Sequence, residues 1–267
     1  MKENARAVLI TGAFGGMGRA TAEFLKENGF LVFALDKTVG NADENIIPIE
    51  ADITSEESIR AALETVRKYT DKLYAVIHFS GIYMLDSLIE MEDEDFCRIF
   101  NVNLRGAFLV NQIFLPLLSD GSRIIITTSE LAPLDPLPFT GIYAVTKSAL
   151  DKYAYSLRME LQLLGISVSV LRAGAVQTKM LGVSTDALTR FCEKTKLYTC
   201  NAERFRQIVE HVEARCISTE KIAEKVGRIL VRKHPSFVYN VNRNPLLLLL
   251  NVLPKRLQLW IIKMILK

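Results

Sequence analysis

Residues 7–20 read AVLITGAFGGMGRA, an apolar run that leads into a glycine-rich turn and then into a helical pattern. Without side chains at Gly12, Gly16 and Gly18, the backbone can turn sharply, approach a pyrophosphate closely and bring the following helix against the strand. The amino end of that helix would then face the phosphates. A strand that runs directly into such a turn and a helix is the context in which this motif indicates a dinucleotide site.

The rest of the chain repeats this order of strand and helix. Runs rich in Val and Ile are nearly continuous, which is typical of strands covered on both faces. Their alternation with segments of helical period predicts an α/β fold, with a doubly wound, Rossmann-type parallel sheet and right-handed crossovers. The expected strands are 7–11, 30–35, 46–50, 73–79, 123–128 and 166–171, and the expected helices are 18–28, 55–68, 94–118 and 143–164.

Two short signals mark helix ends. Gly29 is expected to close the first helix in a left-handed cap. Thr54 and Glu57 are spaced as a capping box, which predicts that the second helix begins there.

The regular alternation stops after residue 171. Residues 178–217 carry an irregular helical pattern at the carboxyl ends of the strands, where α/β sheets bind ligands, and they are a candidate substrate lid. A helix over 219–232 and a short strand within 235–241 would complete a sheet of about seven strands. Because the sequence shows no linker, repeat or low-complexity tract, residues 1–267 are expected to form a single domain.

Asp36 ends the second expected strand, a short distance after the glycine turn. A carboxylate at this position can bind both hydroxyls of an adenosine ribose and would repel a 2′-phosphate. The residue before Gly16 is Gly15, not a cation that could neutralise such a phosphate, so NAD is favoured over NADP. Lys37 argues the other way, since it could swing toward a phosphate. An ordinary turn residue at a strand end is the alternative for Asp36.

Residues 141–147 read GIYAVTK and hold Tyr143 and Lys147 four positions apart. In a helix this spacing puts both side chains on one face, one turn apart. A nearby cation favours the ionised phenol, so it would lower the tyrosine pKa from its usual value of about 10 toward a range useful for acid–base catalysis. A chance pair on an amphipathic helix is the alternative.

Composition excludes several functional classes. The 33 basic and 30 acidic residues give a net charge of +3, far from the concentrated positive charge of a nucleic-acid-binding protein. Four cysteines form no CxxC pair and have no histidines at metal-ligand spacing, so neither a metal site nor a disulfide framework is expected. The apolar run near the start is too short for a signal-peptide core. These features predict a cytoplasmic protein with reduced thiols.

Five ordered motifs make the chain resemble the classical short-chain dehydrogenase/reductase family between about residue 5 and Thr178. TGAFGGMG at 11–18 is similar to that family's TGxxxGxG turn, and DI at 52–53 is similar to its adenine-contacting pair. The other matches are NVNLRG with Asn103, GSRIIITTS ending at Ser129, and YAVTK with Tyr143 and Lys147. The family's NNAG motif is replaced by HFSG, in which only the last residue, Gly81, is retained.

The resemblance implies an oxidoreductase in which hydride passes directly between a nicotinamide and a secondary alcohol or ketone. Tyr143 would exchange a proton with the substrate oxygen, and Ser129 would hydrogen-bond to the same oxygen. Lys147 would hold the nicotinamide ribose and lower the pKa of Tyr143. Asn103 would anchor a water that joins Lys147 to bulk solvent.

The cofactor contacts that the resemblance implies lie along the glycine turn, at the following strand ends and after the sixth strand. There Val176 would meet the carboxamide through its backbone, and Thr178 would meet a phosphate through its hydroxyl. The family also implies a homodimer or homotetramer. The full expected cofactor set is Gly12, Phe14, Gly16, Met17, Gly18, Asp36, Asp52, Ile53, Gly81, Tyr143, Lys147, Val176 and Thr178.

Residues 244–267 read NPLLLLLNVLPKRLQLWIIKMILK. Pro254, Lys255 and Arg256 interrupt the apolar run, which leaves each half too short to span a bilayer. Packing within the protein or between subunits is the favoured interpretation of this segment, peripheral contact with a membrane surface is the second, and a cover over the substrate mouth is the third. All three fit a lipophilic substrate.

Residues 155–171, taken with this apolar segment, resemble the hydroxysteroid and retinol dehydrogenase branch of the family. The leading hypothesis is therefore an NAD(H)-dependent oxidoreductase of a bulky lipophilic alcohol or ketone, such as a hydroxysteroid, bile acid or retinoid. The alternatives are a 3-oxoacyl thioester reductase and a non-catalytic nucleotide-binding regulatory or membrane scaffold protein. Intact Ser129, Tyr143 and Lys147 argue against the last of these, since a binding module does not need an activated phenol.

Overall fold

The computed structural model describes residues 6–212 and 216–267, together with the side chains of these residues other than 179–185 and 208–212. The first five residues, and the part of the predicted lid at 213–215, lie outside this description.

Seven parallel strands form one sheet in the order β3-β2-β1-β4-β5-β6-β7. The predicted fold, a doubly wound α/β sheet of about seven strands, is confirmed. The strand order reverses between β1 and β4, which is where sheets of this kind bind ligands at the carboxyl ends of their strands. The strands are β1 (Ala7–Thr11), β2 (Leu31–Asp36), β3 (Ile46–Glu50), β4 (Ala75–His78), β5 (Arg123–Ser129), β6 (Ser167–Ala173) and β7 (Val238–Val241).

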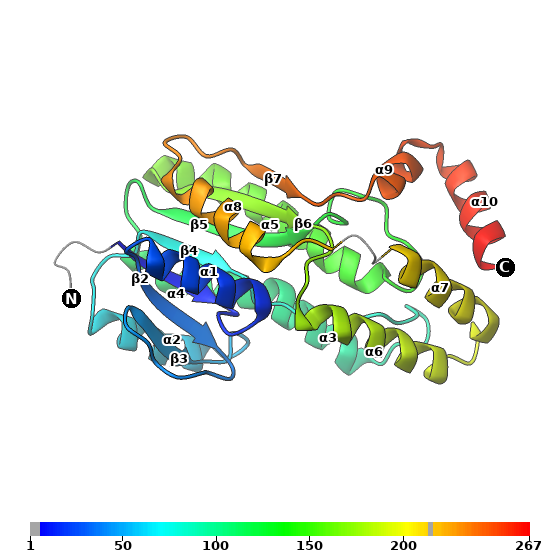
Figure 1. Ribbon diagram of the computed structural model, residues 1–267, viewed down its shortest axis with the longest axis horizontal. Coiled ribbons are helices and arrows are strands. Elements are labelled where there is room, and N and C mark those ends of the chain that lie inside the picture. Colours follow the sequence, from blue (N-terminus) through cyan, green and yellow to red (C-terminus); the bar gives the residue numbers. More distant parts are fainter. Residues whose placement is uncertain (1–5, 213–215) are drawn as a thin grey trace.

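Helices cover both faces of the sheet (Figure 1). On one face α1 (Gly16–Glu27) and α8 (Thr219–Val231) lie side by side, and their apolar side chains pack against β1, β2 and β6. On the other face lie α2 (Glu56–Arg67), α4 (Gly106–Phe114) and α5 (Gly141–Leu161), the last extended by a 3-10 turn at Gln162–Leu164. Because both faces are covered, the five inner strands are almost wholly buried, as their continuous apolar pattern predicts, whereas the edge strands β3 and β7 are only partly buried.

The predicted helix over 94–118 is not continuous. It consists of α3 (Asp93–Phe100), a π-helical segment at Asn101–Arg105, α4, and a 3-10 turn at Leu115–Leu117. Apolar periodicity alone does not reveal such a break. The π segment turns Asn103 into the interior, where 1% of its surface is exposed. Single π turns of this kind are common at functional sites.

Of the two predicted caps, one is confirmed and one is wrong. Gly29 has the left-handed backbone (φ 82°) predicted for the end of α1. Helix α2, however, is capped by Ser55, whose side chain accepts a hydrogen bond from the Ser58 N–H. Thr54 instead donates to the Asp52 carboxylate through its N–H and its hydroxyl, which removes it from the cap.

Four helices lie beyond the carboxyl edge of the sheet, namely α6 (Lys179–Lys194), α7 (Thr199–Val212), α9 (Pro245–Val252) and α10 (Lys255–Leu266) (Figure 1). The described side chains of α6 and α7 share an apolar cluster with Leu85, Tyr83 and Phe139 from the loops at that edge. Among the described residues, no helix is long and apolar enough to cross a membrane.

Candidate active site

The glycine turn after β1 is tightly enclosed by backbone. Gly12 has a φ of 68°, and a Cβ added there would lie 2.6 Å from the Ser80 backbone nitrogen. A Cβ on Gly18 would lie 2.0 Å from the Gly12 carbonyl oxygen, so the start of α1 can pack against the turn only as glycine. Helix α1 begins without a side-chain cap or an acidic residue in its first turn. Its amino end is therefore suited to a negatively charged phosphate group.

A cavity of about 1010 Å³ opens beside this turn. It runs from the ends of β2 and β3, past the turn, to the loop after β4 and the start of α6. The cavity is also lined by residues that were not predicted as site residues, namely Ser80, Tyr83, Arg98, Arg105 and Arg190. Of the predicted cofactor residues, it is lined by Gly12, Gly16, Met17, Gly18, Asp36, Asp52, Ile53, Gly81 and Thr178.

The far end of the cavity carries two carboxylates and a lysine. Asp36 Oδ2 accepts a hydrogen bond from the Phe14 N–H (2.9 Å), which ties the end of β2 to the glycine turn. The Lys37 ammonium lies 2.9 Å from Asp52 Oδ2. The bond from Lys37, with those from Thr54, lowers the pKa of Asp52 to about 2, so this carboxylate is ionised at neutral pH. Lys37 is thus drawn toward Asp52.

Four predicted cofactor residues do not line this cavity, namely Phe14, Tyr143, Lys147 and Val176. Phe14 packs into the apolar cluster beneath α1, where its ring touches the position of Gly40, so its part in the turn is played by its backbone N–H. Val176 is buried and forms a bridge to Ile217. The two hydrogen bonds of that bridge use the Ala175 carbonyl and the Gln177 N–H, not the backbone groups of Val176 itself.

Ser129, Tyr143 and Lys147 are brought together at the carboxyl end of β5. Ser129 is the last residue of β5, and Tyr143 lies in the first turn of α5, where the two hydroxyls hydrogen-bond. Desolvation raises the pKa of Tyr143 to about 12, and the Ser129 hydroxyl only partly opposes this effect. The phenol therefore holds its proton at neutral pH and can donate it to a neighbouring oxygen.

Lys147 is 5% exposed, and its Nζ lies 5.7 Å from the centre of the Tyr143 ring. Its ammonium donates a long hydrogen bond (3.4 Å) to the Thr127 carbonyl. Burial lowers the pKa of Lys147 to about 8. In the chain alone the pKa of Tyr143 is therefore raised and not lowered as expected, because removal from water favours the neutral form of the phenol.

Asn103 joins three segments of the site. Its Oδ1 accepts from the Ile82 N–H (2.8 Å), while its Nδ2 donates to the Ile82 carbonyl (3.0 Å) and to the Thr146 hydroxyl (3.1 Å). A Cβ on Gly81 would lie 3.2 Å from Asn103 Oδ1 and 3.3 Å from Lys147 Nζ. The loop after β4, the π segment and α5 are thus locked together directly beside Lys147.

A buried ion pair holds α5 against the sheet below Ser129. The Arg172 guanidinium on β6 contacts both carboxylate oxygens of Asp151 on α5, at 2.9 and 2.6 Å. Thr128 donates to the same carboxylate (3.3 Å). The bidentate geometry fixes the orientation of both side chains, so the helix that carries Tyr143 and Lys147 is held to the strand that carries Ser129.

Two functional candidates were missed by sequence reasoning. The ring of Tyr83 packs on Tyr143, with 4.9 Å between ring centres, yet Tyr83 lies in a loop without periodic signal. Glu130, which follows Ser129, is half-buried and accepts a hydrogen bond from the Asn244 N–H (2.6 Å), and this burial raises its pKa. Both contacts join segments that are distant in the sequence.

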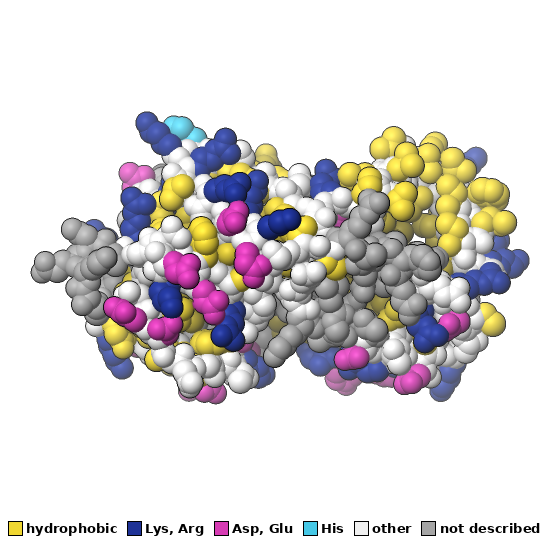
Figure 2. All heavy atoms as spheres, viewed as in Figure 1, with side chains coloured by type: hydrophobic (Ala, Val, Ile, Leu, Met, Phe, Trp, Pro, Cys, Tyr) yellow, Lys and Arg dark blue, Asp and Glu magenta, His cyan; other side chains and the backbone are white. Residues whose placement is uncertain are grey.

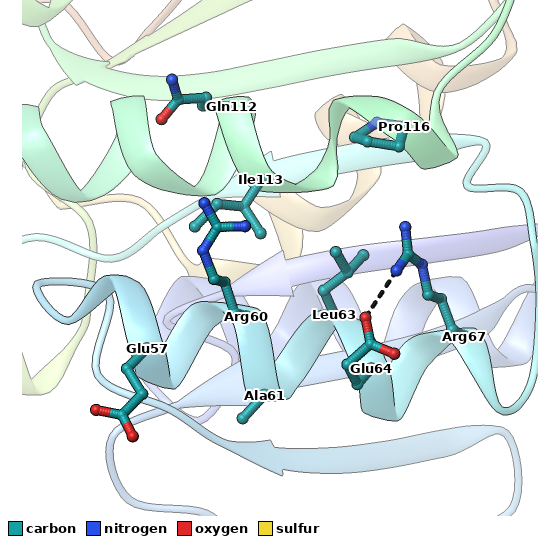
Figure 3. Close-up of a pocket in the computed structure, with 9 residues that line it drawn as sticks. All are labelled: Glu57, Arg60, Ala61, Leu63, Glu64, Arg67, Gln112, Ile113 and Pro116. Atoms are coloured by element: carbon teal, nitrogen blue, oxygen red, sulfur yellow. Dashed lines mark hydrogen bonds and ion pairs between the residues drawn. The ribbon is translucent and has the colours of Figure 1, made fainter.

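A second hollow, of about 590 Å³, lies between α2 and α4 (Figure 3). None of the predicted site residues line it. Its charged side chains are engaged along their own helix, Arg60 with Glu56 and Arg67 with Glu64. This hollow is a surface groove between two helices.

A family model described as short chain dehydrogenase matches residues 6–188. One relative is an NADPH-dependent 1-acyldihydroxyacetone phosphate reductase from Schizosaccharomyces pombe, 32% identical over 67% of this chain and 62% of the relative. A second is an estradiol 17-beta-dehydrogenase 2 from Mus musculus, 34% identical over 66% of this chain and 49% of the relative. A third is a 3-ketodihydrosphingosine reductase from Bacteroides thetaiotaomicron, 24% identical over 86% of this chain and 85% of the relative. The match thus spans about half to two thirds of the first two relatives.

The fold also matches solved structures at low identity. One is a short chain dehydrogenase/reductase from Burkholderia phymatum in complex with NAD, with a TM-score of 0.73 and 20% identity over 93% of this chain and 92% of that one.

Replacement of Asn103 by Ala is expected to leave the buried N–H of Ile82 without its partner and to remove the link to Thr146. The expected loss in the free energy of unfolding is about 1–3 kcal/mol for such an unsatisfied buried group, measured by chemical denaturation. Asn101→Ala is the matched control, since Asn101 is exposed in the same π segment, and a change within about 0.5 kcal/mol is expected there. Equal losses in the two variants would contradict the assigned role of Asn103.

Proposed function

The chain belongs to the short-chain dehydrogenase family, and from this premise we propose that it is an NAD(H)-dependent oxidoreductase that interconverts a bulky lipophilic secondary alcohol and the corresponding ketone. The observation that carries the proposal is the Tyr143 phenol, which is hydrogen-bonded to Ser129, lies beside the Lys147 ammonium and packs on Tyr83, a residue that lines the cavity beside the glycine turn. Ordinary packing does not require a buried phenol, hydroxyl and ammonium to be grouped in this way.

The residues present fit a dinucleotide. The glycine turn leaves no room for a Cβ at Gly12 or Gly18, the amino end of α1 lacks a side-chain cap, and the cavity continues to Asp36. When bound, the nicotinamide supplies or accepts the hydride.

The protein's own groups would handle the proton. In reduction, the protonated Tyr143 hydroxyl donates to the carbonyl oxygen, and the Ser129 hydroxyl orients that oxygen by a second hydrogen bond. Lys147 contributes positive charge beside the phenol, which stabilises the phenolate formed after proton transfer. Asn103 keeps Lys147 in this position through Gly81, Ile82 and Thr146.

Aromatic side chains support a lipophilic substrate. Tyr83 packs on Tyr143 and belongs to an apolar cluster that continues through Phe139 to Phe191 and Phe205 of α6 and α7. These two helices cover the carboxyl edge of the sheet and are the proposed substrate lid. The names of the three relatives support the same class, because they refer to 1-acyldihydroxyacetone phosphate, estradiol and 3-ketodihydrosphingosine.

The preference for NAD rests on Asp36. Its carboxylate lines the cavity at the end of β2, where it would repel a 2′-phosphate, and the nearest lysine is paired with Asp52. The NADPH-dependent relative shows that the family also uses the phosphorylated cofactor, so this preference needs a direct test.

The proposal includes a homodimer or homotetramer assembled through α4 and α5. The outer faces of these helices expose several large apolar side chains, which is the composition expected of a subunit contact. They are Phe108 on α4 and Val145, Tyr155 and Met159 on α5.

Replacement of Tyr143 by Phe removes the proton donor and keeps the ring. Turnover of an oxo-steroid or long-chain ketone with NADH is expected to fall by a factor of about 10²–10⁴, while NADH affinity stays nearly unchanged. Both quantities are followed through nicotinamide absorbance and fluorescence. Tyr155→Phe on the exposed face of α5 is the control and should keep full turnover. Undiminished turnover in Tyr143→Phe would exclude this phenol as the acid.

The rate of ketone reduction is expected to fall as pH rises through about 8. In this range Lys147 (pKa about 8) loses its charge, whereas Tyr143 (pKa about 12) keeps its proton, so the first loss on the alkaline side belongs to the lysine. The measurement is kcat/KM for reduction against pH. Lys147→Arg retains its charge up to about pH 12, so its remaining activity should lose this decline. A wild-type profile without an alkaline decline near pH 8 would contradict the assignment.

Replacement of Asp36 by Asn removes the negative charge and keeps an acceptor for the Phe14 N–H. The ratio of kcat/KM for NADH to that for NADPH is expected to fall at least about tenfold, since the repulsion of a 2′-phosphate is lost. Glu50→Gln is the matched control, because Glu50 is the register neighbour of Asp36 on β3 and is exposed outside the cavity lining. A ratio unchanged in Asp36→Asn would remove the basis for the NAD preference.

A further inference from the structure

Helices α9 and α10 form an arm beyond the carboxyl edge of the sheet (Figure 1). No residue of α9 is buried, and the only buried residue of α10 is the polar Gln258. Packing within the chain, one part of the favoured interpretation, therefore leaves many apolar side chains of this segment exposed. The exposed apolar side chains are Leu246, Leu249, Val252, Leu257, Leu259, Trp260, Met264 and Ile265, which together we call the tail patch.

The arm is held in place by polar contacts. At its start, Glu130 accepts from the Asn244 N–H, and farther along the Asp135 N–H donates to Asn251 Oδ1 (3.0 Å). Asp135 also pairs with Lys255. Near its other end, Asn201 of α7 donates to the Leu266 carbonyl (2.6 Å). These bonds fix both helices while leaving the tail patch outward, so its exposure is a built feature of the fold.

The charge of the arm has one sign. Residues 244–267 contain four cations, Lys255, Arg256, Lys263 and Lys267, and no acidic residue. All four side chains are exposed. Figure 2 shows the apolar surface over α9 and α10 with basic side chains along its edge. An apolar surface whose own segment carries only positive charges matches the interface of an anionic bilayer, with its apolar interior and negative headgroups.

We propose that the tail patch docks on the surface of an anionic lipid bilayer, with α9 and α10 lying in the plane of the interface. A second copy of the chain fits this surface less well. A twofold contact brings a patch against itself, so the cations of one arm would face those of the other, and the acid beside the arm, Asp135, is already paired with Lys255. A lipid surface supplies the missing negative charge and accepts the apolar side chains together.

The arm also lies beside the loop that follows Ser129 and beside the apolar cluster that contains Tyr83. Glu130 and Asp135, which anchor it, belong to the loop that directly follows Ser129, and Leu266 packs in the cluster that contains Tyr83 and Phe139. Docking would therefore bring the substrate side of Tyr143 close to the lipid. This step rests on the proposed function. A lipophilic ketone could then pass from the bilayer to the site without crossing bulk water.

Trp260 is the single tryptophan of the chain and is 59% exposed within the tail patch, so its fluorescence reports directly on docking. Full-length protein is mixed with vesicles of phosphatidylcholine alone or of phosphatidylcholine with phosphatidylglycerol. With the anionic vesicles, the expected result is emission shifted to shorter wavelength, quenching by brominated lipids and co-sedimentation. Binding should weaken in about 1 M NaCl, where the screening length falls to about 3 Å.

The double variant Arg256→Glu/Lys263→Glu is expected to lower partition into anionic vesicles at least about tenfold. The matched control is Lys72→Glu/Lys233→Glu, which changes the net charge equally at exposed sites outside the arm and should bind like the wild type. Partition equal in both double variants would overturn the proposal. So would absence of binding to any vesicle, or a Trp260 emission shift that follows protein concentration without lipid and accompanies a doubled mass, which would assign the patch to a second copy.

Vesicle binding does not depend on turnover. The Tyr143→Phe protein carries the same tail patch and is expected to bind vesicles as the wild type does. Loss of lipid binding with intact ketone reduction would overturn the docking proposal alone, whereas intact lipid binding without any turnover would overturn the proposed function alone.

Discussion

The catalytic end of this protein depends on the hydrogen bonds of a single buried amide. Asn103 binds both backbone groups of Ile82 and the hydroxyl of Thr146, so it joins the loop after β4 to the helix that carries Tyr143 and Lys147. The loop can approach this closely because residue 81 is glycine, with Lys147 Nζ only 3.3 Å from where a Cβ would stand. The π turn at 101–105 directs Asn103 inward, so a local irregularity of one helix sets the geometry of the whole site.

Burial sets the protonation states of the reacting groups. Tyr143 and Lys147 lie where the charged form of each is poorly solvated, which raises the pKa of the phenol and lowers that of the ammonium. The phenol thus remains a proton donor at neutral pH. The ion pair of Asp151 and Arg172 beneath the site differs, because its two opposite charges are in bidentate contact and stabilise each other.

The segments next to Ser129 and Tyr143 combine polar anchoring contacts with exposed apolar surface. Glu130 and Asp135, in the loop after Ser129, bind backbone and side-chain groups of the arm, while the apolar side chains of α9 and α10 point outward. The described side chains of α6 and α7 pack instead on an aromatic cluster that reaches Tyr143 through Tyr83. Helices α6 and α7 thus cover the carboxyl edge of the sheet, whereas α9 and α10 present apolar side chains to the outside.

Local pattern was sufficient for the strands, because continuous apolar runs between glycine turns leave little choice of structure. All seven strands and helices α1, α2, α5 and α8 lie within a few residues of their predicted ranges. The break in the 94–118 helix and the cap at Ser55 were not predicted, since both depend on single hydrogen bonds that periodicity does not record. The roles of Tyr83 and Glu130 were missed for a related reason, because their partners, Tyr143 and Asn244, are distant in the sequence.

The sequence by itself determined the succession of strands and helices and the glycine turn, and it singled out Ser129, Tyr143 and Lys147 as the expected proton-handling residues, because these depend on residue type and short spacing. Only the tertiary structure decided the direction of the pKa shifts, the anchoring of Asn103 and the outward face of the arm. Desolvation, long-range hydrogen bonds and exposure depend on which distant segments pack together, and no local pattern contains that information.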